Sequence, residues 1–136
     1  MPVRISSTAP RHIARRYLAG QCDTLARAIG NSTGFPLWAM KNKEEQIEHV
    51  FVRDPASGLA VDIRGAMPLE EISKGSALEH SPHRFSEVEI DEVTATFGTP
   101  TPGDIRDAKR ALKDHLTRTL EKVREVSPER SDEIAP

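Results

Sequence analysis

Three residues of this sequence could act together as a thiol-dependent catalytic site: Cys22, His49 and Asp62. A thiol attacks a carbonyl carbon once it has become a thiolate, and a neighbouring imidazole can remove the proton and later return it. A carboxylate behind the imidazole fixes the orientation of the ring. These residue types therefore predict catalysis through a covalent thioester on Cys22, with His49 as base and acid and Asp62 as its orienting group.

Cys22 is the only cysteine of the chain, and it lies at the predicted start of a helix. The first backbone N–H groups of a helix have no partner within it, so they favour a thiolate and can receive an oxyanion. A buried, inert cysteine is the alternative, because free cysteines are among the most buried residues. The apolar stripe of this helix consists of Cys22, Leu25, Ala26 and Ile29.

His49 and Asp62 lie on two segments that read as a β-hairpin. Residues 47–53 and 59–64 have the composition of strands, and residues 54–58 have the composition of a turn. Taken separately, a histidine within a strand can be structural, and an aspartate can lie on the solvent face of a sheet. Their significance depends on whether the hairpin brings them to one face.

The apolar side chains of the two strands can share a face only in certain pairings. In each cross-strand pair, the two residue numbers must add to an odd total. Val52 opposite Leu59, or Arg53 opposite Ala60, satisfies this condition. His49 and Asp62 are direct cross-strand partners if Val52 lies opposite Leu59. They are diagonal neighbours if Arg53 lies opposite Ala60. Phe51 falls on the face that carries His49 and Asp62, and we expect this face to pack against the Cys22 helix.

The remaining elements are predicted from apolar periodicity and from the positions of Gly and Pro. We expect helices over 10–20 and 21–31, strands over 37–40 and 88–97, a short helix over 69–72 and a final helix from Asp104 onward. This order predicts an α+β fold, in which N-terminal helices pack on a short antiparallel sheet beside a long C-terminal helix. Residues 1–126 are expected to form one domain, and residues 127–136 a flexible tail.

Length and composition restrict the functional classes. The chain has 136 residues, a net charge of −2, one cysteine and no long apolar run. We therefore expect a soluble, cytoplasmic protein without membrane association or specific nucleic-acid binding. The first 20 residues contain no apolar segment typical of a secretory signal, while export by a signal-free route and the oligomeric state stay open.

The segments 21–29 and 49–65 resemble papain-like and transglutaminase-like cysteine enzymes. In that superfamily a cysteine at a helix start precedes a histidine on a strand, and an aspartate or asparagine follows on the next strand. The resemblance covers residues 17–65. It implies a small papain-like fold and hydrolysis, deamidation or acyl transfer at an amide or ester of a protein or peptide, without a cofactor.

The sequence departs from that superfamily near the predicted oxyanion site. Papain-like enzymes carry a glutamine several residues before the cysteine, whereas Gln21 is immediately adjacent to Cys22. We expect the backbone N–H of Cys22 to receive the oxyanion, with the side chain of Gln21 or Tyr17 in support. The segment between helix and hairpin is short, which predicts a shallow cleft or one shared with a partner.

Two other interpretations remain open. His80 and His83, with Glu79 beside them, could begin a metal site, but a third ligand is not evident, so we expect no metal. A non-catalytic binding module of the inhibitor, immunity or adaptor type could use the final helix or a sheet edge as its contact surface. In that case Cys22 would be buried and inert, and would be alkylated only after unfolding.

Overall fold

The computed structural model describes residues 3–126 and has the α+β architecture expected from the sequence. Within these residues, helices combine with a six-stranded antiparallel sheet. The elements are β1 (Ile5–Ser6), α1 (Arg11–Ala19), α2 (Cys22–Thr33), β2 (Leu37–Asn42), β3 (Ile47–Arg53), β4 (Ala60–Asp62), β5 (Gly65–Met67), the 3-10 helix η1 (Leu69–Ser73), β6 (His83–Glu87), α3 (Ile90–Phe97), α4 (Pro102–His115) and α5 (Thr117–Glu125).

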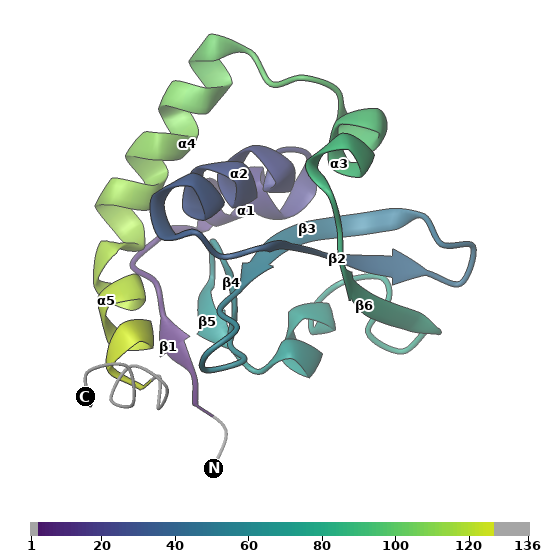
Figure 1. Cartoon of the computed structure of the whole chain (residues 1–136), viewed down its shortest axis with the longest axis horizontal. Helices are drawn as coiled ribbons and strands as arrows, with labels where there is room; N and C mark the ends of the chain where they lie inside the picture. Colours follow the sequence, from purple (N-terminus) through teal and green to yellow (C-terminus); the bar gives the residue numbers. More distant parts are fainter. Residues whose placement is uncertain (1–2, 127–136) are drawn as a thin grey trace, which may run out of the picture.

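The strands follow the order β1-β5-β4-β3-β2-β6 across the sheet. Helices α1 and α2 cover one face, α4 and α5 run along the side next to β1, and η1 lies on the opposite face (Figure 1). Both faces of the sheet are therefore covered, and each carries an apolar core. The main core includes Leu25, Ile29, Val50, Val52, Val61, Ile63, Leu116 and Val123. The second core includes Met40, Phe51, Ala60, Met67 and Ile72.

The β3–β4 hairpin has one of the two predicted pairings. Arg53 lies opposite Ala60, and Val52 lies opposite Val61, so paired numbers add to an odd total. The intervening loop, residues 54–59, has the even length that this parity requires. The imidazole and the carboxylate of the candidate site are therefore diagonal neighbours on one face of the sheet.

The expectation that the Phe51 face packs against the Cys22 helix is wrong. Phe51 belongs to the second core, whereas α2 packs on the opposite face, against Val50 and Val52. The physical reason is bulk: the smaller β-branched residues let a helix approach the sheet closely, and the aromatic ring fills the space beside η1. Cys22 therefore has to reach His49 past the backbone of β3.

The strand expected over 88–97 is also wrong, because this segment is mainly helix α3. Its β-branched residues suggested a strand, yet only Val93 is fully buried, with Asp91 and Glu92 in the first turn. Acidic residues there interact favourably with the helix dipole. The strand lies earlier, as β6.

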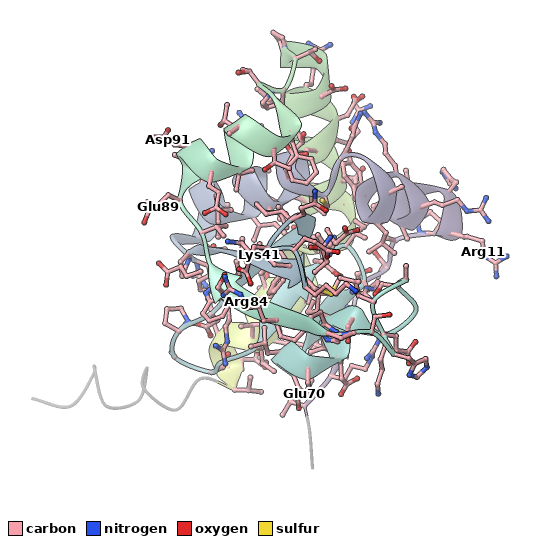
Figure 2. The ribbon with its side chains drawn as sticks, turned by 90° about the vertical axis from the view of Figure 1, so that its right-hand side faces the viewer. Arg11, Lys41, Glu70, Arg84, Glu89 and Asp91 are labelled. Carbon is pink, nitrogen blue, oxygen red and sulfur yellow. The ribbon has the colours of Figure 1, made fainter. Side chains whose placement is uncertain are left out.

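Strand β6 forms one edge of the sheet by pairing with β2. Charged pairs accompany this edge: Lys41 lies 2.7 Å from a carboxylate oxygen of Glu92 in α3, and Arg84 pairs with Glu45. Figure 2 shows Lys41 and Arg84 on this side of the molecule. The first pair joins α3 to the sheet, which helps to explain why helix replaces strand there.

The second strand of the hairpin is shorter than expected. It ends at Asp62, residues 63–64 form a tight turn, and the chain returns in the sheet as β5 from Gly65. Gly65 has a φ of +123°, and a Cβ at this position would lie 2.1 Å from the carbonyl oxygen of Ile5. Only glycine allows both the turn and the close approach of β1.

Replacing Gly65 by alanine is expected to lower the free energy of unfolding by about 2–3 kcal/mol, because the new methyl group strains the backbone and displaces β1. Urea unfolding measures this loss. Gly20→Ala is the matched control, since no heavy atom lies within 4 Å of the added methyl group, and it should change stability by less than about 1 kcal/mol. Equal effects of the two substitutions would contradict this account of the turn.

The final helix expected from Asp104 onward forms, but it is divided. Helix α4 ends at His115, and α5 continues from Thr117 after Leu116, whose φ of −119° and ψ of −8° depart from helical geometry. Leu116 itself is fully buried, so packing against the core explains the local distortion. The expected tail, 127–136, lies outside the described residues. Within residues 3–126, no helix is both long and apolar enough to cross a bilayer.

Candidate active site

The thiol of Cys22 lies at the first residue of α2 and contacts the backbone of β3. The N–H of Val50 donates a hydrogen bond to Sγ of Cys22, with a distance of 3.4 Å. The pairing of Val52 with Val61 would place Ile63 opposite Val50, but β4 ends one residue earlier. The sulfur therefore occupies the place of a missing strand partner, where the sheet opens between β3 and β4.

His49 and Asp62 form a direct contact. Nε2 of the imidazole lies 3.0 Å from Oδ2 of the carboxylate, and both side chains are at least 95% buried. The imidazole also stacks on the ring of Phe51, with 6.0 Å between ring centroids. The His49 ring is thus held by the Asp62 carboxylate at one nitrogen and by the Phe51 ring stacked against its face.

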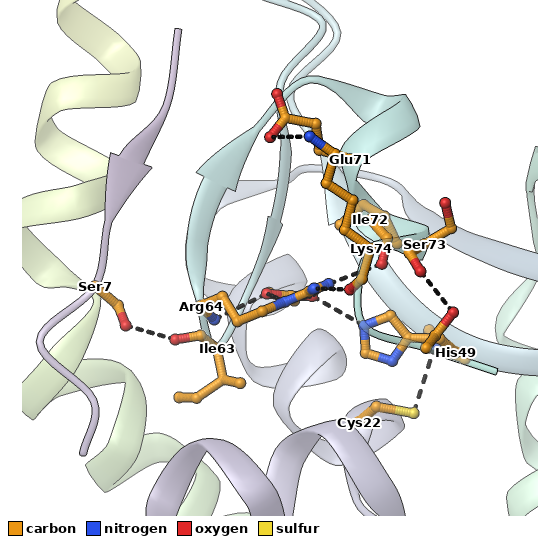
Figure 3. Close-up of polar contacts among 12 residues, drawn as sticks. Ser7, Cys22, His49, Ile63, Arg64, Glu71, Ile72, Ser73 and Lys74 are labelled. Carbon is orange, nitrogen blue, oxygen red and sulfur yellow. Dashed lines mark hydrogen bonds and ion pairs between the residues drawn. The ribbon is translucent and has the colours of Figure 1, made fainter. Parts of the chain in front are cut away.

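The imidazole connects the carboxylate to the thiol. Beyond its contact with Asp62, the His49 ring lies beside Cys22, whose sulfur accepts a hydrogen bond from the backbone N–H of the next residue of β3, Val50 (Figure 3). Figure 3 shows the Cys22 side chain beside the His49 ring, with the sulfur directed toward the strand. The structure therefore brings together the three residues that the sequence selected, in the order thiol, imidazole and carboxylate.

Arg64 completes the surroundings of Asp62. Its backbone N–H donates to Oδ1 at 2.8 Å, and its guanidinium donates from Nε to both oxygens at 3.2 Å and from Nη2 to Oδ2 at 2.7 Å. A buried carboxylate is costly unless it is paired and hydrogen-bonded. Here it has a cation on one side and the imidazole on the other.

Protonation of the pair follows from these contacts. Burial, the largest single influence, would lower the pKa of His49, but the hydrogen bond to Asp62, the charge of that carboxylate and the neighbouring Cys22 thiol together outweigh it and raise the pKa to about 9. Burial would raise the pKa of Asp62, but the hydrogen bonds from His49 and Arg64 outweigh it and lower the pKa to about 2. At neutral pH the pair is therefore an imidazolium and a carboxylate, held beside the thiol.

A cavity of about 250 Å³ adjoins His49. Met40, Ile72 and Leu18 form apolar parts of its wall, and residues 74–78 enclose another side. Cys22 is absent from the lining and is only 3% exposed. The imidazole thus borders the cavity, while the sulfur lies behind it.

The two predicted supporting residues have different surroundings. Tyr17 is buried in the main core together with Cys22. The amide oxygen of Gln21 accepts a hydrogen bond from Arg16 at 2.9 Å, and the amide nitrogen donates one to Asp104 at 3.4 Å. The Gln21 side chain thus joins α1 to α4, and it would have to leave both partners to bind an oxyanion.

Sequence reasoning missed Arg64 and the cavity segment 74–78. A signal for Arg64 was present, because side chains two residues apart in an extended chain point to the same side, and Arg64 follows Asp62 at that spacing. No comparable signal marked residues 74–78, since the turns there are ordinary and their place beside His49 depends on the whole fold.

The alternative metal interpretation gains no further ligand from the structure. Among residues 3–126, no three or more His, Cys, Asp or Glu side chains are grouped so that they could hold a metal ion. The His80 side chain is 91% exposed, and Nδ1 of His83 bonds to the backbone oxygen of Ser81 at 2.7 Å.

Comparisons with protein-family models, with curated proteins and with solved structures find no match to this chain. The resemblance to papain-like and transglutaminase-like enzymes stays a prediction.

Proposed function

We propose that this protein is a thiol-dependent hydrolase or acyltransferase that forms a covalent thioester on Cys22. The observation that supports the proposal is the arrangement in which Cys22 opens α2, the His49 ring lies beside its thiol, and Asp62 contacts the imidazole at 3.0 Å (Figure 3). Burying an ion pair costs several kcal/mol of desolvation, and an apolar core of the same volume is often as stable. Perturbed ionisable groups of this kind concentrate at functional sites.

The proposed reaction uses each group once in each half. The Cys22 thiolate attacks an acyl carbon, the carbon–sulfur bond forms, and the His49 imidazolium gives its proton to the leaving amine or alkoxide. Water or an acceptor amine then attacks the thioester, His49 takes its proton, and the carbon–sulfur bond breaks to return the thiolate. Asp62 holds the imidazole in place, and the backbone N–H of Cys22 is the proposed donor to the oxyanion.

A protein or peptide acyl group is the proposed substrate, and the cavity beside His49 is its proposed entry. Because Cys22 is 3% exposed, an acyl carbon can reach the sulfur only if the cavity wall or the imidazole moves. Residues 74–78 of that wall contain neither helix nor strand. We propose that displacement of this segment opens the cavity toward the sulfur.

One observation favours a second candidate, the non-catalytic binding module. Cys22 packs within the main core and is almost fully buried, as an inert structural cysteine would be. The two candidates differ in the reactivity of the folded thiol. A catalytic thiol reacts in the native state, whereas a sealed structural thiol reacts only after unfolding.

Native alkylation of Cys22 tests the proposal directly, because the chain has a single thiol. Iodoacetamide labelling followed by mass spectrometry gives a rate constant for the folded chain, and the same chain in urea gives the rate constant of an unactivated thiol. The enzyme proposal predicts that the folded chain is labelled faster than the unfolded chain at pH 6.5. Labelling confined to the unfolded chain would exclude the mechanism and support the binding module.

A trapping experiment then identifies the intermediate. Incubation with an activated ester such as p-nitrophenyl acetate, quenched in acid, should leave an acetyl group on Cys22 of the folded chain. Cys22→Ser is the matched control, since it keeps the size of the side chain and should not accumulate a thioester.

A further inference from the structure

We propose that Arg64 is a positioning residue of this site, which holds the Asp62 carboxylate and the wall of the cavity with one guanidinium group. The inference rests on the proposed function for its catalytic meaning. It also rests on contacts that the sequence did not reveal. The partners of Arg64 are the Asp62 carboxylate and the backbone of the cavity wall. Its side chain is 21% exposed, so most of it is enclosed by these partners.

The first set of contacts reaches the carboxylate. Nε and Nη2 of Arg64 donate to the oxygens of Asp62, and the shortest of these distances is 2.7 Å. Two donors on one rigid plane fix the plane of a carboxylate as well as its position. The oxygen that accepts the Nη2 bond, Oδ2, is also the oxygen that contacts the imidazole of His49.

The second set reaches the cavity wall. Nη1 donates to the backbone oxygen of Lys74 at 3.0 Å, and Nη2 donates to the backbone oxygen of Ile72 at 2.9 Å. Figure 3 shows Arg64 extending from the β4–β5 turn to the segment that contains Ile72 and Lys74. Both Ile72 and Lys74 line the cavity.

One guanidinium therefore links the orienting carboxylate to the wall that has to move for substrate to reach the sulfur. A displacement of the segment at Ile72 and Lys74 would pull on Arg64, and through it on Asp62 and the imidazole. Lysine cannot replace this geometry, because its ammonium is a point charge without the planar fork. Arg64 thus couples the position of the wall to the alignment of His49.

The test compares Arg64→Lys and Arg64→Ala with the unmodified chain. The first readout is the rate constant for alkylation of Cys22 at pH 6.5, and the second is the NMR signal of the His49 ring N–H that faces Asp62. We expect both variants to lose about 10- to 100-fold in rate, the range expected when a catalytic group is displaced by up to 1 Å. We also expect the His49 signal to shift or broaden in both.

Arg53→Ala is the matched control. Arg53 is also partly buried and also donates to a backbone oxygen, that of Gly58, while stacking on Trp38 away from the three site residues. It should leave the alkylation rate and the His49 signal unchanged even if the fold becomes less stable. Circular dichroism establishes which variants are folded, and Arg64→Lys carries the test if Arg64→Ala unfolds.

The outcomes separate the two proposals. Folded Arg64→Lys with an unchanged rate and an unchanged His49 signal would overturn the positioning role and leave Arg64 as a structural tie. If the unmodified chain is labelled no faster than the unfolded chain, the proposed function fails. In that case the His49 signal alone decides whether Arg64 positions the pair: a shift in Arg64→Lys supports it and an unchanged signal contradicts it.

Discussion

Replacing His49 by alanine is expected to slow the alkylation of Cys22 at pH 6.5 by about 100-fold or more, and to abolish accumulation of the acyl-enzyme. The imidazole lies between the thiol and the carboxylate, so its removal takes away both the group that accepts the proton and the cation beside the sulfur. Positioned acid–base groups contribute about 100- to 10,000-fold to such reactions. The measurement is the rate constant for labelling of the folded chain, normalised to the rate for the same variant in urea.

His80→Ala is the control for this substitution. His80 is another histidine of the same chain, and its side chain is 91% exposed. It should change the labelling rate less than twofold, since the ring has no contact with the site. A His49→Ala variant that keeps its fold and reacts at the unmodified rate would show that the imidazole does not activate the thiol. A rate that rises instead would show that His49 only restricts access to the sulfur.

Replacing Asp62 by alanine is expected to lower the free energy of unfolding by about 3 kcal/mol at pH 6, because removing one partner leaves the charges of His49 and Arg64 without their anion. This loss in the free energy of unfolding lies near the lower end of the range for breaking a buried ion pair. His49 can lose its proton in the variant, and Arg64 keeps partial contact with solvent. Urea unfolding monitored by circular dichroism measures the difference. The variant should also lose most of the rapid labelling of Cys22, since the ring is no longer oriented.

The effect of this substitution should depend on pH in a defined way. The raised pKa of His49 contributes stability that is complete below the unfolded value of about 6.5 and that is lost as pH rises through about 9. The lowered pKa of Asp62 contributes stability above its unfolded value of about 4 that is lost as pH falls toward about 2. The difference between the unmodified chain and Asp62→Ala should therefore be largest between about pH 4 and 6.5 and shrink on both sides.

Asp107→Ala is the control. Asp107 pairs with Arg16 at 3.1 Å, but its side chain is 50% exposed, so the substitution should cost less than about 1 kcal/mol. Equal losses for the two aspartates would contradict the assignment of a buried ion pair to Asp62.

The sequence by itself determined that His49 and Asp62 share a face of the sheet. The reason is local, because side chains alternate along a strand and the apolar residues of both strands must be buried together. Those two conditions fix the parity of the pairing before any tertiary contact is considered. The loop then selects the pairing, since the carboxylate of Asp54 accepts hydrogen bonds from the backbone N–H groups of Ala56 and Ser57.

The same local reasoning failed where packing overrides propensity. The segment at 88–97 is rich in β-branched residues, yet from Ile90 onward it forms helix α3, which buries only Val93 and has an acidic first turn that suits a helix. Strand preference depends on the surface a residue meets, and a sequence window does not contain that surface.

Only the tertiary structure decided that the thiol meets the imidazole. Cys22 and His49 belong to opposite sides of the sheet. They come together because β4 ends at Asp62, before the position opposite Val50, so the N–H of Val50 donates its hydrogen bond to the sulfur of Cys22. The cavity and the guanidinium of Arg64 likewise depend on segments distant in the chain. Alternation along a strand is a property of neighbouring residues and can be read from them, whereas a contact across a gap in a sheet depends on where several other elements stop.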